Sequence, residues 1–137
     1  MVDPDRTNIR IKRLSELIGR LEEIREQGED TYLADPALQA MTERWLEVAI
    51  QICIDLGLQV LTEKFAPIPG KYADVFLTLG SEGLLPDDLA ARLADAARQR
   101  NLLAHLYLEI DDKAVFASLS HLDDLRRFAA FVEEQLD

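Results

Sequence analysis

AIQICIDLGLQVL, the stretch from Ala49 to Leu61, is apolar on nearly every side when it is wound into a helix. A helix that is apolar all round lies at the centre of a protein or has partners on two sides. The residues before it, from Pro36 onward, are apolar on one face only, and Asp35 followed by Pro36 is a typical helix start. We therefore predict one long central helix from Pro36 to about Lys64.

Helical patterns precede and follow this central segment. Residues 6–29 place leucine and isoleucine at steps of three and four, which is typical of an amphipathic helix, and TYLADP (31–36) ends that pattern. The two prolines and the glycine of FAPIPGK (65–71) indicate a loop. A short helix with one apolar face is then expected from Tyr72 to about Ser81.

Two further helices complete the predicted fold. Pro86 opens a helix that carries RQRNLLAHLYLEID (98–111), and Asp111 with Asp112 indicates the start of a last helix that ends near Gln135. No segment alternates in the way that a strand does. The chain is therefore predicted to be all-α, an up-and-down bundle of about five helices, four of them long, in one domain over residues 1–137.

The composition narrows the class of function. The chain has 137 residues and a formal net charge of −11, which argues against broad nonspecific adhesion to nucleic acid or anionic lipid. Cys53 is the single cysteine, so a disulfide framework is excluded and a reducing compartment is expected. No apolar run reaches the length of a membrane span and no signal segment opens the sequence, so a cytoplasmic location is expected.

One arginine interrupts the apolar face of the helix that Pro86 opens. Leu89, Leu93 and Ala96 lie at helical spacing, and the same steps lead to Arg100, then Leu103 and Tyr107. A buried arginine without a partner is costly. Arg100 is therefore expected either to pair with a carboxylate such as Asp55 or Glu43, or to line a functional site.

The polar residues around Arg100 suit phosphodiester chemistry. Asn101 and His105 are four residues apart and are direct neighbours on a helix, while Arg100 and Tyr107 are seven apart and share a face. The arginine fork matches a phosphate, and histidine exchanges a proton near neutral pH. In RNA the 2′-hydroxyl can attack the adjacent phosphate, so no metal is required. No metal cluster is predicted either, since His121 is far from His105 in the sequence and Cys53 is alone.

The segment Arg100-Asn101-Leu-Leu-Ala-His105-Leu-Tyr107 matches the R-N-x-x-x-H motif of HEPN domains, extended by x-Tyr. This extended form resembles the HepT-like toxins of HEPN/minimal-nucleotidyltransferase toxin–antitoxin pairs. The segments DPALQAMTERWLEVAIQICIDLG (35–57) and KYADVFLTLGSEGLLP (71–86) also resemble the second and third helices of that family. The resemblance thus covers nearly the whole chain.

The resemblance implies a homodimer with two-fold symmetry, in which the motif helices of both subunits form one composite cleft. It implies metal-independent cleavage of cellular RNA, with no cofactor, in a prokaryotic cytoplasm. Arg100 would bind the scissile phosphate, His105 would be general acid or base, and Asn101 would orient His105 or the phosphate. The partner would be a minimal nucleotidyltransferase antitoxin that transfers AMP to Tyr107, a residue that would also contact the substrate.

Two other interpretations remain open at this point. The chain could be a non-catalytic, nucleotide-binding subunit that presents substrate to the nucleotidyltransferase, or a plain structural bundle in which Arg100 is sealed against a carboxylate. The acidity of the chain also opposes RNA binding, because RNA affinity depends on phosphate neutralisation. A nuclease would have to gather Arg44, Arg92, Arg98 and Arg100 in its cleft. Lys71 and Arg98 could contact the RNA backbone, but surface solvation is the expectation for both.

Overall fold

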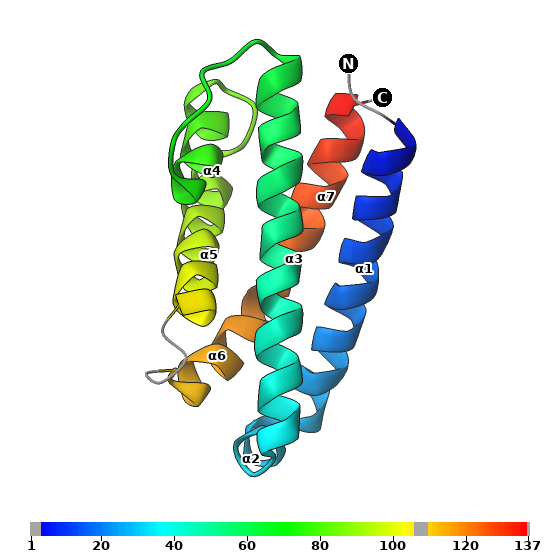
Figure 1. Cartoon of the computed structure of the whole chain (residues 1–137), viewed down its shortest axis with the longest axis vertical. Helices are drawn as coiled ribbons and strands as arrows, with labels where there is room; N and C mark the ends of the chain where they lie inside the picture. The colour runs from blue at the N-terminus through cyan, green and yellow to red at the C-terminus, as the bar shows by residue number, and fades with distance from the viewer. Residues whose placement is uncertain (1–3, 106–109, 137) are drawn as a thin grey trace.

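The computed structural model describes residues 4–105 and 110–136, and every regular element within these ranges is helical. Its four long helices are α1 (Pro4–Gln27), α3 (Pro36–Glu63), α5 (Asp87–His105) and α7 (Leu122–Leu136). They alternate in direction along the bundle, and α3 lies between α5 and the pair formed by α1 and α7 (Figure 1). The all-α, up-and-down fold and the four long helices are confirmed.

The start of α3 has the predicted cap. The Asp35 carboxylate accepts hydrogen bonds of 3.1 Å from the backbone N–H groups of Ala37 and Leu38, and Pro36 occupies the first turn. Two short helices complete this part of the chain: α2 (Glu29–Leu33), which lies in the stretch predicted to break the first helix, and α4 (Tyr72–Ser81). The predicted short helix over 72–81 is therefore confirmed.

The prediction of one continuous last helix is wrong. It is divided into α6 (Asp112–Ser118), a 3-10 turn η1 (Leu119–His121) and α7, although Asp111 caps α6 as expected. Arg25 of α1 donates a hydrogen bond of 3.2 Å to the Leu119 carbonyl at this turn. Leu119 and Leu122 are both buried across the break. Because a three-residue step suits a 3-10 turn as well as an α-helix, the apolar spacing did not reveal the division.

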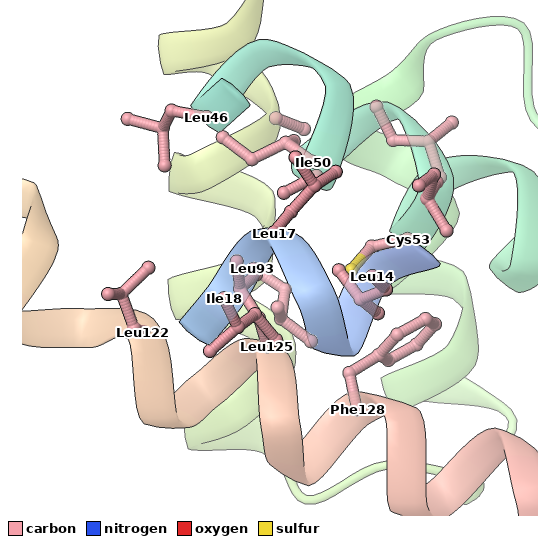
Figure 2. Packing of buried hydrophobic residues seen from close by; sticks show 14 of the residues in the cluster. Leu14, Leu17, Ile18, Leu46, Ile50, Cys53, Leu93, Leu122, Leu125 and Phe128 are labelled. Carbon is pink, nitrogen blue, oxygen red and sulfur yellow. The ribbon is translucent and has the colours of Figure 1, made fainter. Parts of the chain in front are cut away.

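The core explains why α3 is apolar all round. Figure 2 shows side chains of α1, α3, α5 and α7 meeting in one cluster, among them Leu14, Ile50, Leu93 and Phe128. Cys53 of α3 is fully buried in this cluster, and burial raises the pKa of its thiol.

Gly57 lets α3 approach α4 closely. A Cβ atom at this position would lie 2.8 Å from Cγ1 of Val75, which is closer than two carbon atoms tolerate. The glycine is therefore a packing requirement of the α3–α4 contact.

The prediction that no apolar run reaches the length of a membrane span does not hold for α3, whose length and composition would allow it to cross one, with a mean hydropathy of 1.4 in its most apolar window. In this structure α3 packs against α1, α4, α5 and α7. Its apolar surface therefore serves the core of the bundle.

Candidate active site at the end of the motif helix

A helical hairpin builds the candidate site. The helices α4 and α5 pack side by side and run in opposite directions, so the start of α4 lies beside the second half of the longer helix α5 (Figure 1). Gly80 permits this close packing, because a Cβ atom there would lie 3.0 Å from the Cβ of Ala90. The hairpin brings Tyr72, the first residue of α4, next to the motif residues near His105, the last residue of α5.

An open cleft of about 600 Å³ lies between the start of α4 and the last two turns of α5. Asn101 and His105 of the motif line it, together with Arg98 of the same helix. The opposite wall comes from the loop before α4 and from its first turn, and consists of Gly70, Lys71, Tyr72, Ala73 and Asp74. Three cationic or proton-exchanging side chains thus face one hollow that also contains an exposed aromatic ring.

Arg100 lies beside this cleft in a largely buried position. Its side chain is 18% exposed, and its guanidinium carbon lies 5.6 Å from the centroid of the Tyr72 ring. Its Nη1 donates a hydrogen bond of 3.3 Å to Oδ1 of Asn101. Its Nε is buried and has no hydrogen-bond partner among the described residues. Among the residues that the structure describes, the donors of Arg100 are therefore only partly used.

Within the described residues, the carboxylate that pairs with Arg100 is that of Glu47. The interpretation of Arg100 as a structural residue had predicted Asp55 or Glu43 as the partner. Oε1 of Glu47 lies 4.0 Å from Nη2 of Arg100, at the outer limit of an ion pair. Asp55 instead accepts a hydrogen bond of 3.0 Å from Gln51, one turn earlier on α3. Within the described ranges, Arg100 is thus neutralised weakly and from one side, so its charge can act on a ligand.

The other expected arginines do not all gather at the cleft. Arg98 lines it and pairs with Asp95 at 2.6 Å. The prediction that Arg92 lies in the cleft is wrong. Arg92 lies between Asp124, at 3.0 Å, and Asp88. Its pKa is raised by the hydrogen bond to Asp124. Arg92 borders a mainly apolar hollow of about 400 Å³ whose lining includes neither Arg100 nor His105.

Lys71 lines the cleft opposite Arg98, so the positive charge of the cleft comes from both walls. Arg44 is 71% exposed and pairs with Glu47 at 3.6 Å. Tyr107 lies outside the described residues. Across the described ranges, no group of three or more His, Cys, Asp or Glu side chains has an arrangement that could hold a metal ion.

Sequence reasoning missed two residues that shape this site, Tyr72 and Glu47. Tyr72 was assigned only as the start of a helix, and no periodic spacing links it to Arg100. Glu47 lies on α3, while Arg100 lies on α5. Both contacts depend on how helices pack, which helical periodicity within one segment does not report.

Residues 14–133 match the family model of HepT-like ribonucleases. The chain belongs to the HepT-like ribonuclease family. Its predicted family and enzyme class, a ribonuclease, are thereby confirmed. A relative from Aphanizomenon flos-aquae (strain 2012/KM1/D3), described as tRNA nuclease HepT, is 30% identical over 123 residues, which cover 87% of this chain and 82% of the relative.

Solved structures of similar proteins share the fold of this HepT-like chain. A tri-AMPylated Shewanella oneidensis HEPN toxin in complex with an MNT antitoxin has a TM-score of 0.87 and 22% identity, covering 96% of this chain and 99% of that one. A toxin–antitoxin complex with AMP-PNP has a TM-score of 0.85 and 22% identity, covering 95% and 99%. At this identity the likeness shows a common bundle.

Proposed function

We propose that this HepT-like ribonuclease is the toxin of a HEPN/minimal-nucleotidyltransferase pair and cleaves cellular RNA in the cytoplasm of a prokaryote without a metal ion or cofactor. Transfer RNA is the first substrate to test, because the Aphanizomenon relative is a tRNA nuclease. Residues 1–137 would form one domain, which the family match over residues 14–133 supports. The observation that carries the proposal is the convergence of Asn101 and His105 on one cleft, with the underused guanidinium of Arg100 beside it.

The proposed reaction is an attack of the ribose 2′-hydroxyl on the adjacent phosphorus. A base takes the 2′-hydroxyl proton, the bond from phosphorus to the 5′ oxygen breaks, and an acid donates a proton to that leaving oxygen. The products carry a 2′,3′-cyclic phosphate and a 5′-hydroxyl. His105 would supply proton transfer, and Arg100 would bind the scissile phosphate and stabilise the charge of the phosphorane. Asn101, which already accepts a hydrogen bond from Arg100, would orient the guanidinium or the phosphate.

A two-fold homodimer would complete this chemistry. One chain offers a single His105, which is exposed at the end of α5, so it can meet the partner subunit's His105 across an axis. In such a dimer one histidine would act as base and the other as acid.

The antitoxin would silence the site by modifying Tyr107. The phenol oxygen of Tyr107 would attack the α-phosphorus of ATP, the phenol proton and pyrophosphate would leave, and the resulting AMP ester would add bulk and negative charge to the motif. Co-incubation with the antitoxin and ATP should increase the mass of the protein by one or more AMP units. Tyr107→Phe should abolish that increase, and persistence of the adduct in this variant would assign modification to another residue.

The test of the nuclease is cleavage of tRNA and of total cellular RNA by the purified, unmodified protein in EDTA. We expect fragments that end in a 2′,3′-cyclic phosphate, and loss of cleavage in His105→Ala and Arg100→Ala. His121→Ala is the matched control, because His121 is exposed on η1 and is not among the residues that line the cleft. Intact RNA with protein that mass spectrometry shows to be free of AMP would favour the nucleotide-binding subunit instead.

A further inference from the structure

The cleft contains one aromatic ring to which the proposed reaction gives no role. Tyr72 is 41% exposed and forms part of the cleft wall opposite Asn101 and His105. The same ring lies 5.6 Å from the guanidinium carbon of Arg100. Tyr72 is therefore the residue that links the phosphate-binding candidate to the open space of the cleft.

We propose that Tyr72 is the platform of a nucleobase subsite, on which one unpaired base of the RNA stacks beside the scissile phosphate. This subsite rests on the proposed function. A phosphate held by Arg100 places the neighbouring nucleotide close to the groups around the guanidinium, and among these Tyr72 is the aromatic ring. Aromatic rings are the usual surface on which proteins stack single-stranded bases.

The charges of the cleft favour a nucleotide that runs through it. Lys71 adjoins Tyr72 on one wall, and Arg98 adjoins Asn101 on the other, so phosphates on both sides of a stacked base would meet a cation. Asp74 is the acidic residue of the same lining, and it lies two residues after Tyr72 on α4. The apolar ring is thus flanked by groups that suit a sugar–phosphate backbone rather than an apolar ligand.

The subsite also addresses how an acidic chain holds RNA. With a net charge of −11, this protein gains little from long-range attraction to phosphates. Stacking on a ring does not depend on charge and is worth a factor of about 5 to 150 in affinity per base. We therefore expect Tyr72 to supply affinity that the electrostatics of the chain do not supply.

The chemistry of stacking makes this subsite a determinant of specificity. A base inside a duplex is already stacked between its neighbours and cannot lie on a protein ring, whereas a base in a loop or at an end can. The RNA cleaved would therefore be unpaired at the nucleotide next to the scissile bond.

The first experiment compares variants on a single-stranded oligoribonucleotide that the wild type cleaves. Tyr72→Leu removes the ring and should lower kcat/KM by about 5- to 150-fold, mainly through a higher KM, while Tyr72→Phe keeps the ring and should stay close to the wild type. Phe65→Leu is the matched control, since Phe65 is 97% exposed and lies outside the cleft lining. Equal activity of Tyr72→Leu and the wild type would overturn the subsite.

An abasic nucleotide next to the scissile bond tests the same contact from the RNA side, without altering the protein. The wild type should lose activity on the abasic RNA, and Tyr72→Leu should not distinguish the abasic RNA from the normal one. If the wild type cleaves both RNAs equally, or if Tyr72→Leu loses the same factor as the wild type, no base stacks on Tyr72. Thermal unfolding of each variant checks that α4 is intact, and the wild-type arm remains decisive even if Tyr72→Leu is unstable.

A binding measurement separates this subsite from the nuclease function. His105→Ala protein is titrated into short single-stranded RNAs with 2-aminopurine at each position in turn, because stacking on a ring quenches this fluorescent base. Quenching that requires the ring at position 72 supports the subsite even if the wild type cleaves no RNA, an outcome that would reject the proposed function alone. Cleavage without such quenching would reject the subsite alone.

Discussion

Oε1 of Glu47 lies 4.0 Å from Nη2 of Arg100 and 3.6 Å from Nη1 of Arg44, so one carboxylate oxygen of α3 is shared by two arginines. The two contacts differ in exposure. Arg100 is 18% exposed and Arg44 is 71% exposed, so water screens the second contact much more than the first. Glu47 should therefore position Arg100 while contributing little through Arg44.

A double-mutant cycle of Glu47→Gln and Arg100→Gln should show this difference. We expect a coupling energy of about 0.2–1 kcal/mol in the free energy of unfolding, measured by urea denaturation, because both side chains keep some exposure. The control cycle of Glu47→Gln with Arg44→Gln should give coupling near zero. Equal coupling in the two cycles would contradict the argument from exposure.

Gly57→Ala should destabilise the bundle. The added methyl group would meet Cγ1 of Val75, a β-branched side chain that cannot rotate away freely, so we expect a net loss of about 1–3 kcal/mol. The matched control is Gly19→Ala in α1, where an added Cβ would meet no atom within 4 Å. That change should instead stabilise by about 0.5–1 kcal/mol, because alanine favours the helix. Thermal and urea unfolding measure the change in the free energy of unfolding of each variant. If both variants stabilised the protein, or both destabilised it, α3 and α4 would not be packed as closely as described.

Tyr32→Phe should not reduce stability. Tyr32 is fully buried in α2, and its hydroxyl has no hydrogen-bond partner in the described part of the chain. Burial, with Asp112 and then Glu43 as smaller causes, raises the pKa of this phenol. Because a buried hydroxyl without a partner is a cost, its removal should leave the free energy of unfolding unchanged or raise it by about 1 kcal/mol.

Tyr32→Leu is the comparison for that variant. It removes the ring that packs 5.4 Å from the Phe116 ring, and should therefore destabilise the contact between α2 and α6. A marked loss of stability in Tyr32→Phe as well would show that the hydroxyl, and not only the ring, holds the two helices together.

Glu43→Gln should stabilise the protein at neutral pH and not at acid pH. Burial, and then repulsion by Asp112, raises the pKa of the Glu43 carboxyl. An acid whose pKa is higher in the folded state costs stability when it is ionised, and this cost disappears as the pH falls below the unfolded-state value of about 4.3. We expect a gain below about 1 kcal/mol at pH 7, since the side chain is partly exposed. Urea unfolding at several pH values measures it.

Asp88→Asn is the control, because the pKa of this carboxyl is shifted in the opposite direction. Hydrogen bonds from the Leu89 backbone, and then from Arg92, lower the pKa of the Asp88 carboxyl. Its ionised form therefore stabilises the fold above its unfolded-state pKa, and this contribution is lost as the pH falls through the folded-state value. Asp88→Asn should accordingly be less stable than the wild type at pH 7. If both variants shifted stability in the same direction, the assignment of these two carboxyls would be wrong.

Elements with one strong local signal could be predicted from the sequence. The cap at Asp35, the apolar surface of α3 and the loop before Tyr72 each follow from neighbouring residues, and the structure contains all three. The turn at Leu119 could not be predicted, because its carbonyl is satisfied by Arg25, a residue from the other end of the chain.

The site could be predicted only where its residues lie on one helix. Asn101 and His105 share a helix, so their spacing brings them together by helix geometry alone. Tyr72 and Glu47 reach Arg100 only through the packing of α4 and α3 against α5. The residues that share a segment with Arg100 were found, and those that pack against it from other helices were not.

The core that α1 shares with α7 also determines when the chain can fold during its synthesis. Leu14 lies in the same cluster as Phe128, so the bundle cannot close until the ribosome has made both. The motif up to His105 is finished first, and translation of residues 106–128 takes on the order of a few seconds. We expect the nascent chain to be without nuclease activity during this interval, because the core that holds the motif helix in place is not yet closed.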